Sequence, residues 1–179
     1  MVSLIHKYLN AGVVIKHKFE ETTKGVPQGG PLSPLLSNIY LNEFDKEMER
    51  RGNHFVRYAD DCVLLFKSER SALRVKETVT KYLEEKLFVK VNQEKTMVAY
   101  ITGIKFLGFG FYIEKRGNVQ IKVHKKSKEK MKKKLKAITK RNRPITSKQL
   151  AKELEMFIRG WVNYYKIADM KGYLKEIDQ

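Results

Sequence analysis

The chain has 179 residues, 42% of them hydrophobic, and a formal net charge of +17. This length fits one domain, or a domain with a small appendage. A chain of this size buries roughly 70% of its unfolded surface on folding, so it needs no disulfide or metal cross-links. The one cysteine excludes a disulfide framework and a multi-cysteine zinc site, and the four scattered histidines lack metal-ligand spacing. No stretch approaches the roughly 18 apolar residues that cross a bilayer, and no signal peptide is recognisable. We therefore expect a soluble protein of the cytoplasm.

In chain order, the first third predicts a helix, a turn and a second helix. Residues 2–10 are typical of a helix end, and residues 13–24 predict extended segments joined by a turn. Residues 25–34, GVPQGGPLSP, hold three glycines and three prolines. Ser33 then predicts a side-chain cap for a helix that ends near Gly52. Its apolar residues recur every four positions at Leu36, Tyr40, Phe44 and Met48.

The middle third predicts strands around one helix. Residues 54–66 predict strand, turn and strand, with the turn at residues 59–61, Ala-Asp-Asp. Residues 68–86 predict a helix with one apolar face. Residues 87–92 and 95–101 predict two further strands. The apolar face of the helix comprises Ala72, Val75, Val79, Tyr82 and Leu83.

The last third changes from hairpin to helix near residue 125. Residues 104–115 and 119–124 predict a hairpin. A lysine-rich helix follows, with a thin apolar stripe, and RNRP at residues 141–144 ends it. Thr146 then begins a capping box for a final long helix. The stripe comprises Met131, Leu135 and Ile138, and the final helix presents Leu150, Leu154, Phe157, Ile158, Trp161 and Tyr165 on one side.

The positive charge is concentrated at this lysine-rich helix. Between Lys122 and Arg143 there are twelve Lys or Arg residues and one acid, Glu129. Such a block is typical of a phosphate-binding surface, although a solvated helix face is the simpler alternative. A membrane surface is disfavoured because the segment has few large apolar anchors. The charge pattern therefore favours a nucleic-acid partner and no membrane.

Asp60 and Asp61 are adjacent acids between two apolar segments of this basic chain. At a turn between buried strands, both carboxylates would project from one end of the sheet, where their repulsion requires cations. Mg²⁺ favours such oxygen ligands, and a pair of metals about 3.5–4 Å apart serves in-line nucleotidyl transfer. Taken alone, the pair is more typical of a solvated turn, because Asp favours turns.

The surrounding motifs favour the metal-binding interpretation. Residues 58–61, YADD, resemble the YxDD hairpin of reverse transcriptases, and residues 25–45 resemble the loop-and-helix motif of the group II intron-encoded reverse transcriptases. Residues 91–98 resemble the motif that places a lysine near the nucleotide phosphates. Residues 106–111, FLGFGF, resemble the primer-grip hairpin, and residues 159–174 resemble the thumb or maturase helix. The resemblance spans nearly the whole chain in five ordered blocks.

The resemblance implies an α+β fold with a partial polymerase palm over residues 1–112, a connecting hairpin over 113–124 and a helical thumb over 125–179. In this fold, Asp60 and Asp61 would be catalytic and would bind two Mg²⁺ ions. Nucleotide and template would contact Pro27, Gln28, Gly29, Gly30, Tyr58, Ala59 and Lys95. The primer grip would comprise Leu107 and Gly108. The nucleic-acid backbone would contact Lys125, Lys126, Lys128, Lys132, Lys133, Lys136, Arg141 and Arg143.

One part of the family pattern is missing. A complete palm has a third catalytic carboxylate on an earlier strand, preceded by fingers, whereas the acids ahead of Gly25 are Glu20 and Glu21, which fit no such motif. Two carboxylates from one turn would hold two Mg²⁺ ions poorly, so we expect little or no polymerase activity from the chain alone. It is then a domain of a larger enzyme, a truncated relic, or half of a split enzyme whose partner supplies the fingers and first aspartate.

The leading functional hypothesis is part of an RNA-directed DNA polymerase that uses an RNA template, a DNA primer and dNTPs. A non-catalytic RNA-binding maturase that assists splicing of intron RNA is the second. A reverse transcriptase recruited to bacterial defence shares these motifs and is the third. The palm of a DNA-templated polymerase is disfavoured, because the PQGG and FLGF motifs indicate the reverse transcriptases.

Overall fold

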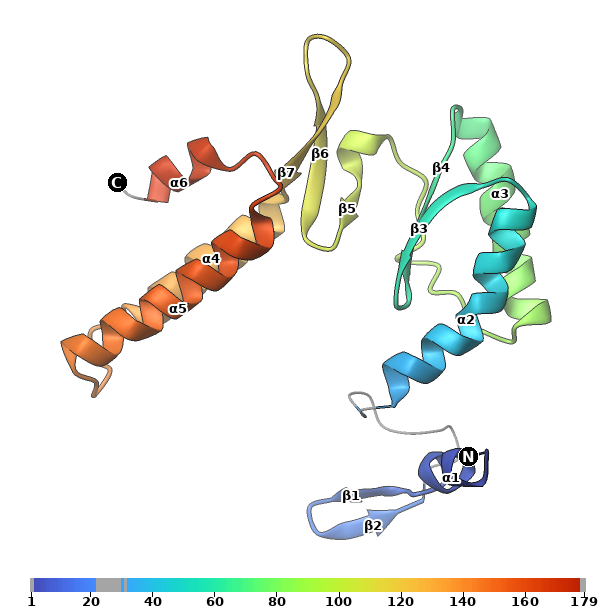
Figure 1. Cartoon of the computed structure of the whole chain (residues 1–179), viewed down its shortest axis with the longest axis horizontal. Coiled ribbons are helices and arrows are strands. Elements are labelled where there is room, and N and C mark those ends of the chain that lie inside the picture. Colours follow the sequence, from blue (N-terminus) through green and yellow to red (C-terminus); the bar gives the residue numbers. More distant parts are fainter. Residues whose placement is uncertain (1, 22–29, 31, 178–179) are drawn as a thin grey trace. The chain divides into compact units, whose positions relative to one another are not determined.

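The computed structural model describes residues 2–21, 30 and 32–177, which belong to two compact units, Met1–Asn92 and Gln93–Gln179 (Figure 1). Each unit combines helices with short antiparallel strands. This composition agrees with the expected α+β class. The division into palm, connecting hairpin and thumb stays a prediction.

The N-terminal segment forms α1 (Val2–Leu9) and an antiparallel hairpin of β1 (Val13–Ile15) and β2 (Lys18–Glu20). Gly12 precedes the hairpin with φ +68, and a Cβ there would lie 2.5 Å from the ring of Phe19. This close approach favours glycine. The predicted helix and extended segments are confirmed over these residues.

The next helix, α2 (Ser33–Arg50), begins slightly earlier than predicted. Ser33 is its first helical residue and its side chain makes no capping bond, so the predicted serine cap is wrong. The backbone N–H of Ser33 instead donates to the carbonyl of Gly30 at 3.2 Å, which extends the helix start by one residue. Pro34 still lies in the first turn, and the helix ends before Gly52 with φ +67, as predicted.

A hairpin and a second helix follow. β3 (His54–Tyr58) and β4 (Asp61–Leu65) pair antiparallel, which confirms the predicted strand, turn and strand. The helix α3 (Glu69–Lys81) is capped by Ser68, whose hydroxyl accepts a hydrogen bond from the backbone N–H of Ser71. It continues as a π-helical turn, η1 (Tyr82–Lys86). The predicted helix over residues 68–86 is therefore confirmed as a helical segment.

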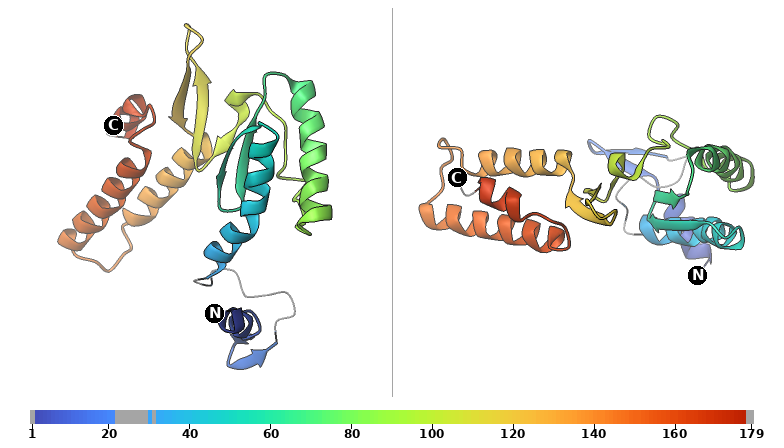
Figure 2. Two further views of the ribbon diagram at one scale, coloured as in Figure 1. Left: turned by 45° about the vertical axis from the view of Figure 1, so that its right-hand side comes forward. Right: turned by 90° about the horizontal axis from the view of Figure 1, so that it is seen from above.

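These elements share one core. Figure 2 shows α2 and α3 side by side next to the β3–β4 hairpin. The rings of Phe44 on α2 and Phe55 on β3 meet edge to face with centroids 6.3 Å apart. Because this core joins both helices to both strands, it fixes the hairpin on α2. The buried residues of the core are Phe44, Met48, Val79 and Leu87.

The predicted strands at residues 87–92 and 95–101 are wrong. Both segments belong to the described part of the chain and neither forms a strand there. Leu87 is buried in the core and its carbonyl accepts a bond from the hydroxyl of Tyr40, while the N–H of Val89 bonds to the carbonyl of Leu83 at 2.9 Å. The carbonyl of Leu87 and the N–H of Val89 are thus already bonded to α2 and to η1, so the apolar alternation over residues 87–92 does not lead to a ladder.

The second unit begins with a three-stranded antiparallel sheet. Its strands β5 (Lys105–Phe106), β6 (Phe109–Ile113) and β7 (Val119–Val123) lie in the order β5-β6-β7. The β6–β7 pair confirms the predicted hairpin, with Phe111 opposite Ile121. The short β5 is an additional strand that folds back through a tight turn onto β6.

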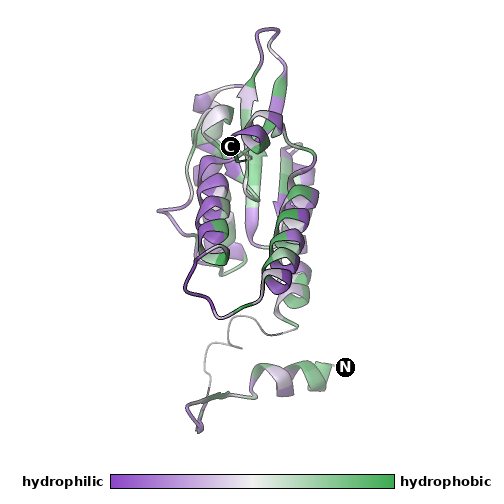
Figure 3. Ribbon diagram, turned by 90° about the vertical axis from the view of Figure 1, so that its left-hand side faces the viewer, coloured by the Kyte–Doolittle hydropathy of each residue, from purple (hydrophilic) through white to green (hydrophobic). Residues whose placement is uncertain are grey.

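Three helices complete the second unit. α4 (Lys125–Ile138) and α5 (Ser147–Tyr165) run side by side, and α6 (Lys171–Ile177) follows (Figures 1 and 2). Thr146 and Gln149 form the predicted capping box at the start of α5. Figure 3 shows hydrophilic residues, in purple, along both long helices and the loop between them.

The core of the second unit joins the sheet to the helices. Trp161 and Tyr165 on α5 lie with ring centroids 4.6 Å apart, and both pack in this core. The segment after α5 is tied to β7, because the N–H of Asp169 donates to the carbonyl of Ile121 at 2.8 Å. The buried residues of this core are Val123, Tyr165, Ala168 and Met170.

Candidate functional site

The aspartate pair lies at the tip of the β3–β4 hairpin. Tyr58 and Asp61 face each other across the strands, so the turn comprises Ala59 and Asp60 and is one residue shorter than expected. Cross-strand partners share one face of a sheet. Tyr58 is 64% exposed on that face, and both carboxylates are exposed. The tip therefore presents two acids and one aromatic ring to solvent.

The donor set at this tip fits a hard divalent cation only in part. Asp60 and Asp61 supply carboxylate oxygens, which Mg²⁺ prefers. Within residues 2–21, 30 and 32–177, no group of three His, Cys, Asp or Glu side chains could hold a metal. The described residues therefore offer two carboxylates at the tip, fewer than the three ligand side chains of a complete protein metal site.

Arg57, which sequence reasoning did not single out, connects this tip to α2. Its guanidinium binds the carboxylate of Asp45 through two bonds, with Nε donating to Oδ1 at 2.7 Å. Its Nη1 also donates to the carbonyl of Ala59 and to Oδ1 of Asn38, both at 2.8 Å. The bond to Asp45 raises the pKa of Arg57. An arginine within an otherwise apolar strand was the signal in the sequence.

Cys62 lies on β4 directly across from Arg57. Burial, with a smaller contribution from the carboxylate of Asp45, raises the pKa of the Cys62 thiol to about 11. The thiol is therefore neutral at physiological pH and packs beside the first core. Cys62 is therefore a packing residue of the strand and not a nucleophile.

The glycine-rich loop is described only at its end. Pro27, Gln28 and Gly29 lie outside the described residues. Gly30 is described, and its carbonyl anchors the start of α2. Lys95 is exposed in a turn of the second unit. A role for these residues in binding template or nucleotide stays a prediction.

The expected primer-grip residues form a tight turn between β5 and β6. Leu107 and Gly108 both have positive φ, 49 and 84. The hydroxyl of Tyr164 donates to the carbonyl of Leu107 at 3.0 Å, and the hydroxyl of Ser127 donates to the carbonyl of Gly108 at 2.9 Å. A Cβ on Gly108 would lie 2.4 Å from the hydroxyl of Tyr165. The turn is thus fixed by both long helices of its own unit.

Three of the expected phosphate-binding residues have structural partners. Lys128 and Lys132 lie over the ring of Tyr173, with Nζ 4.6 and 5.8 Å from its centroid. Lys132 also pairs with Glu176 at 2.6 Å. These contacts attach α6 to α4. Arg143, which also has a structural partner, donates to the carbonyl of Ile138 at 2.7 Å and closes the end of α4.

The other five expected phosphate-binding residues are exposed, and no ion pair engages them within the described part of the chain. On α4, buried residues occupy one side, which is formed by Ser127, Met131 and Ile138. At 100° per residue, the free lysines of α4 lie on the other side. The five residues are Lys125, Lys126, Lys133, Lys136 and Arg141.

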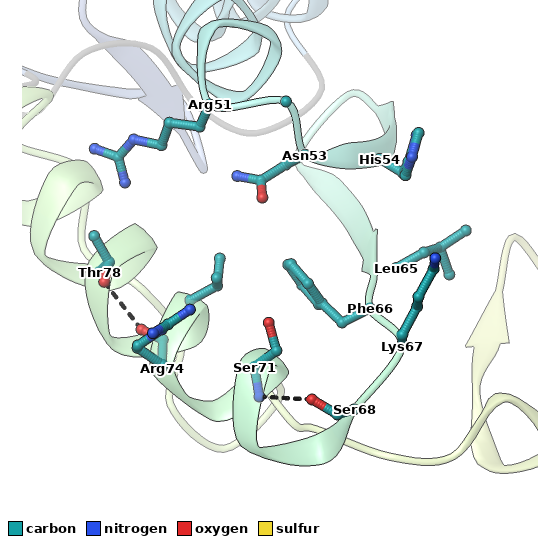
Figure 4. Close-up of a pocket in the computed structure, with 12 residues that line it drawn as sticks. Arg51, Asn53, His54, Leu65, Phe66, Lys67, Ser68, Ser71, Arg74 and Thr78 are labelled. Atoms are coloured by element: carbon teal, nitrogen blue, oxygen red, sulfur yellow. Dashed lines mark hydrogen bonds between the residues drawn. The ribbon is translucent and has the colours of Figure 1, made fainter.

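A cavity of about 550 Å³ lies at the other end of the β3–β4 hairpin (Figure 4). His54 and Leu65, which line it, are paired at the open end of the hairpin, away from the Ala59–Asp60 turn. Arg51, Lys67 and Arg74 also line it, and no acid does. The cavity is therefore separate from the aspartate pair.

No helix in the described part of the chain is long and apolar enough to span a bilayer.

Two family models match the chain. The model described as reverse transcriptase (RNA-dependent DNA polymerase) matches residues 1–111. The model described as group II intron, maturase-specific domain matches residues 128–179. The first match contains the aspartate hairpin, and the second begins within α4.

The chain is also similar to several named proteins. Protein YkfC of Escherichia coli K12 is 31% identical over 60% of this chain and 37% of its own length. The group II intron-encoded protein LtrA of Lactococcus lactis is 54% identical over 26% of this chain and 8% of its own. Protein P of duck hepatitis B virus is 32% identical over 46% of this chain and 11% of its own. The chain thus spans little more than a third of YkfC and far less of the others.

Proposed function

Because the chain belongs to the reverse transcriptase family and carries a group II intron maturase-specific domain, we propose that it forms part of an RNA-directed DNA polymerase. The observation that carries this proposal is the exposed pair Asp60 and Asp61 at the tip of a hairpin fixed on α2. In this proposal, residues 1–112 form a partial palm, residues 113–124 a connecting hairpin and residues 125–179 a thumb.

The two aspartates are the proposed metal ligands. Magnesium bound to them would supply activation of the primer 3′-hydroxyl and charge stabilisation of the leaving pyrophosphate. Tyr58, exposed on the same face as Asp61, would contact the incoming nucleotide or the primer end. The turn at Leu107 and Gly108 is the proposed primer grip, and its rigid anchoring supports a positioning role.

The exposed lysines of α4 are the proposed contacts to the nucleic-acid backbone of template and primer. Lysine neutralises phosphates and releases counterions, so binding should depend strongly on salt. The face comprises Lys125, Lys126, Lys133 and Lys136, whereas Lys128 and Lys132 serve mainly to attach α6.

We expect the 179 residues to synthesise little or no DNA alone, because the described residues bring no third carboxylate to the aspartate pair. Incubation of the chain with an RNA template, an annealed DNA primer, dNTPs and Mg²⁺ tests this directly. Processive primer extension would contradict the expectation, and binding of the primer–template without extension would support it.

A non-catalytic maturase that binds intron RNA is the second candidate, favoured by the maturase-specific match at residues 128–179. The double variant Asp60→Asn, Asp61→Asn distinguishes the two functions. It should abolish DNA synthesis by an enzyme reconstituted with a segment that supplies the fingers and the third carboxylate, while leaving RNA affinity intact. Splicing assistance that survives, together with no measurable synthesis by the reconstituted enzyme that keeps both aspartates, would favour the maturase.

A further inference from the structure

The hairpin tip holds a residue in an unfavourable backbone conformation. Ala59 has φ 52, in the left-handed region that favours glycine. It occupies the first of two positions that connect Tyr58 to Asp61, where hairpins commonly place glycine or asparagine. Such a conformation persists only where the surrounding structure determines it. The contacts of Ala59 therefore matter for the aspartate that follows it.

The contact that engages Ala59 comes from Arg57, two residues earlier. Nη1 of Arg57 donates to the carbonyl of Ala59 at 2.8 Å. This carbonyl belongs to the peptide group that leads into Asp60, so the bond fixes the orientation of that peptide. The Arg57 side chain is only 11% exposed, which shields the bond from competing water.

Arg57 is itself held by α2. Asp45 binds Nε and Nη2 of Arg57 together, and its side chain is 23% exposed. Such a two-bond pair fixes the plane of the guanidinium, which a lysine ammonium cannot reproduce. Phe44, adjacent to Asp45, is buried in the core that joins α2 to the hairpin. The conformation of the tip is therefore fixed relative to α2.

We propose that Arg57, oriented by Asp45, is a positioning residue that holds the Ala59–Asp60 turn and so sets the direction of both aspartates. The contacts that hold the turn are made by protein groups, Arg57 with Ala59 and Asp45. The consequence for metal binding rests on the proposed function of Asp60 and Asp61.

The test uses the whole ¹⁵N-labelled chain and two readouts. The first is the turn conformation, given by the HN–Hα coupling of Ala59 and the amide shifts of Asp60 and Asp61. The second is the Mn²⁺ concentration that half-broadens those amides. For Arg57→Lys we expect an Ala59 coupling that moves toward the averaged value and a half-broadening concentration at least three-fold higher. Asp45→Asn should act in the same direction, because it removes the charge that orients Arg57.

Two control variants separate positioning from stability. Arg159→Lys alters an exposed pair with Glu155 on α5 and should change neither readout. Val79→Ala removes core volume from α3, so it should lower the melting temperature without moving the tip. In Ala59→Gly the left-handed conformation at position 59 has no steric cost, because glycine lacks a Cβ. Combined with Arg57→Lys, it should return the Asp60 and Asp61 amides toward their positions in Ala59→Gly alone.

The outcomes are distinguishable. Wild-type coupling and amide shifts in Arg57→Lys would overturn the proposal. If Arg57→Lys unfolds the first unit, Asp45→Asn decides in its place, and an unmoved tip there would overturn it equally. A tip that moves in Arg57→Lys while Mn²⁺ broadens no tip amide in the wild type would support the positioning role and contradict the metal-ligand function.

Discussion

At the scale of single residues, the hairpin tip combines exposed acids with partly buried neighbours. Asp60 and Asp61 are exposed, as is Tyr58 across from Asp61, whereas Ala59 and Cys62 beside them in the chain are half-buried. Cys62 illustrates the contrast, because it is the immediate neighbour of Asp61 and its thiol is removed from the chemistry by burial.

Cys62 should resist thiol reagents in the folded protein. With a pKa of about 11, the thiolate is scarce at pH 8, so labelling by a disulfide reagent should be far slower than in denaturant. The raised pKa also means that the folded state holds the proton more tightly. The free energy of unfolding should therefore fall as pH rises between about 9 and 11. Equal labelling rates in the folded and denatured chain at pH 8 would contradict this assignment.

Gly108 should tolerate alanine much less well than Gly117. Both have φ +84, but a Cβ at Gly108 would meet the hydroxyl of Tyr165 at 2.4 Å, whereas Gly117 has nothing within 4 Å. We expect a loss of about 1–2 kcal/mol for Gly117→Ala from backbone strain alone. We expect about 2–5 kcal/mol for Gly108→Ala, where overpacking adds to it. Urea unfolding followed by the fluorescence of Trp161 measures both, and equal losses would show that the contact with Tyr165 is unimportant.

At the scale of elements, the lysines of α4 form two groups, one that packs against α6 and one that is exposed. Ser127, Met131 and Ile138 form its buried side, and Lys128 and Lys132 beside them cover the ring of Tyr173 on α6. The remaining lysines have no such partner within the described part of the chain. Burial of the lysine stems against an aromatic ring makes the first group part of the fold.

The two groups of lysines should respond differently to substitution. Lys133→Gln with Lys136→Gln should weaken binding of an RNA–DNA primer–template and reduce the slope of log K against log salt by about two. Lys128→Gln with Lys132→Gln is the matched control, which should lower the melting temperature and change the slope less. Fluorescence anisotropy across a salt series measures the slopes. A control slope that changes by the same amount would remove the distinction between the groups.

At the scale of the whole molecule, local signals in the sequence predicted most elements correctly. The capping box at Thr146, the hairpin with Asp60 at its tip and the apolar stripe of α4 each depend on neighbouring residues, so spacing was sufficient. The strand predicted over residues 87–92 failed, because Leu87 and Val89 use their backbone groups against α2 and η1. Spacing cannot show such contacts between distant residues.

The same limit applies to the candidate site. The motif around Asp60 and Asp61 predicted both their place at the hairpin tip and their exposure. It could not predict that Arg57 would bind Asp45, twelve residues away, and hold the carbonyl of Ala59. The motif also could not distinguish the lysines that pack against α6 from those that have no such partner in the described part of the chain. That distinction depends on where the ring of Tyr173 lies against α4.

The central claim is that Asp60 and Asp61 are metal ligands of a DNA polymerase. Its most direct test is primer extension by an enzyme reconstituted from this chain and a reverse transcriptase segment that supplies the fingers and the third carboxylate. Asp60→Asn with Asp61→Asn should reduce synthesis at least a thousand-fold, about 4 kcal/mol of activation free energy. The adjacent exposed pair Glu20→Gln with Glu21→Gln should leave synthesis unchanged. Undiminished extension by the aspartate variant would contradict the claim.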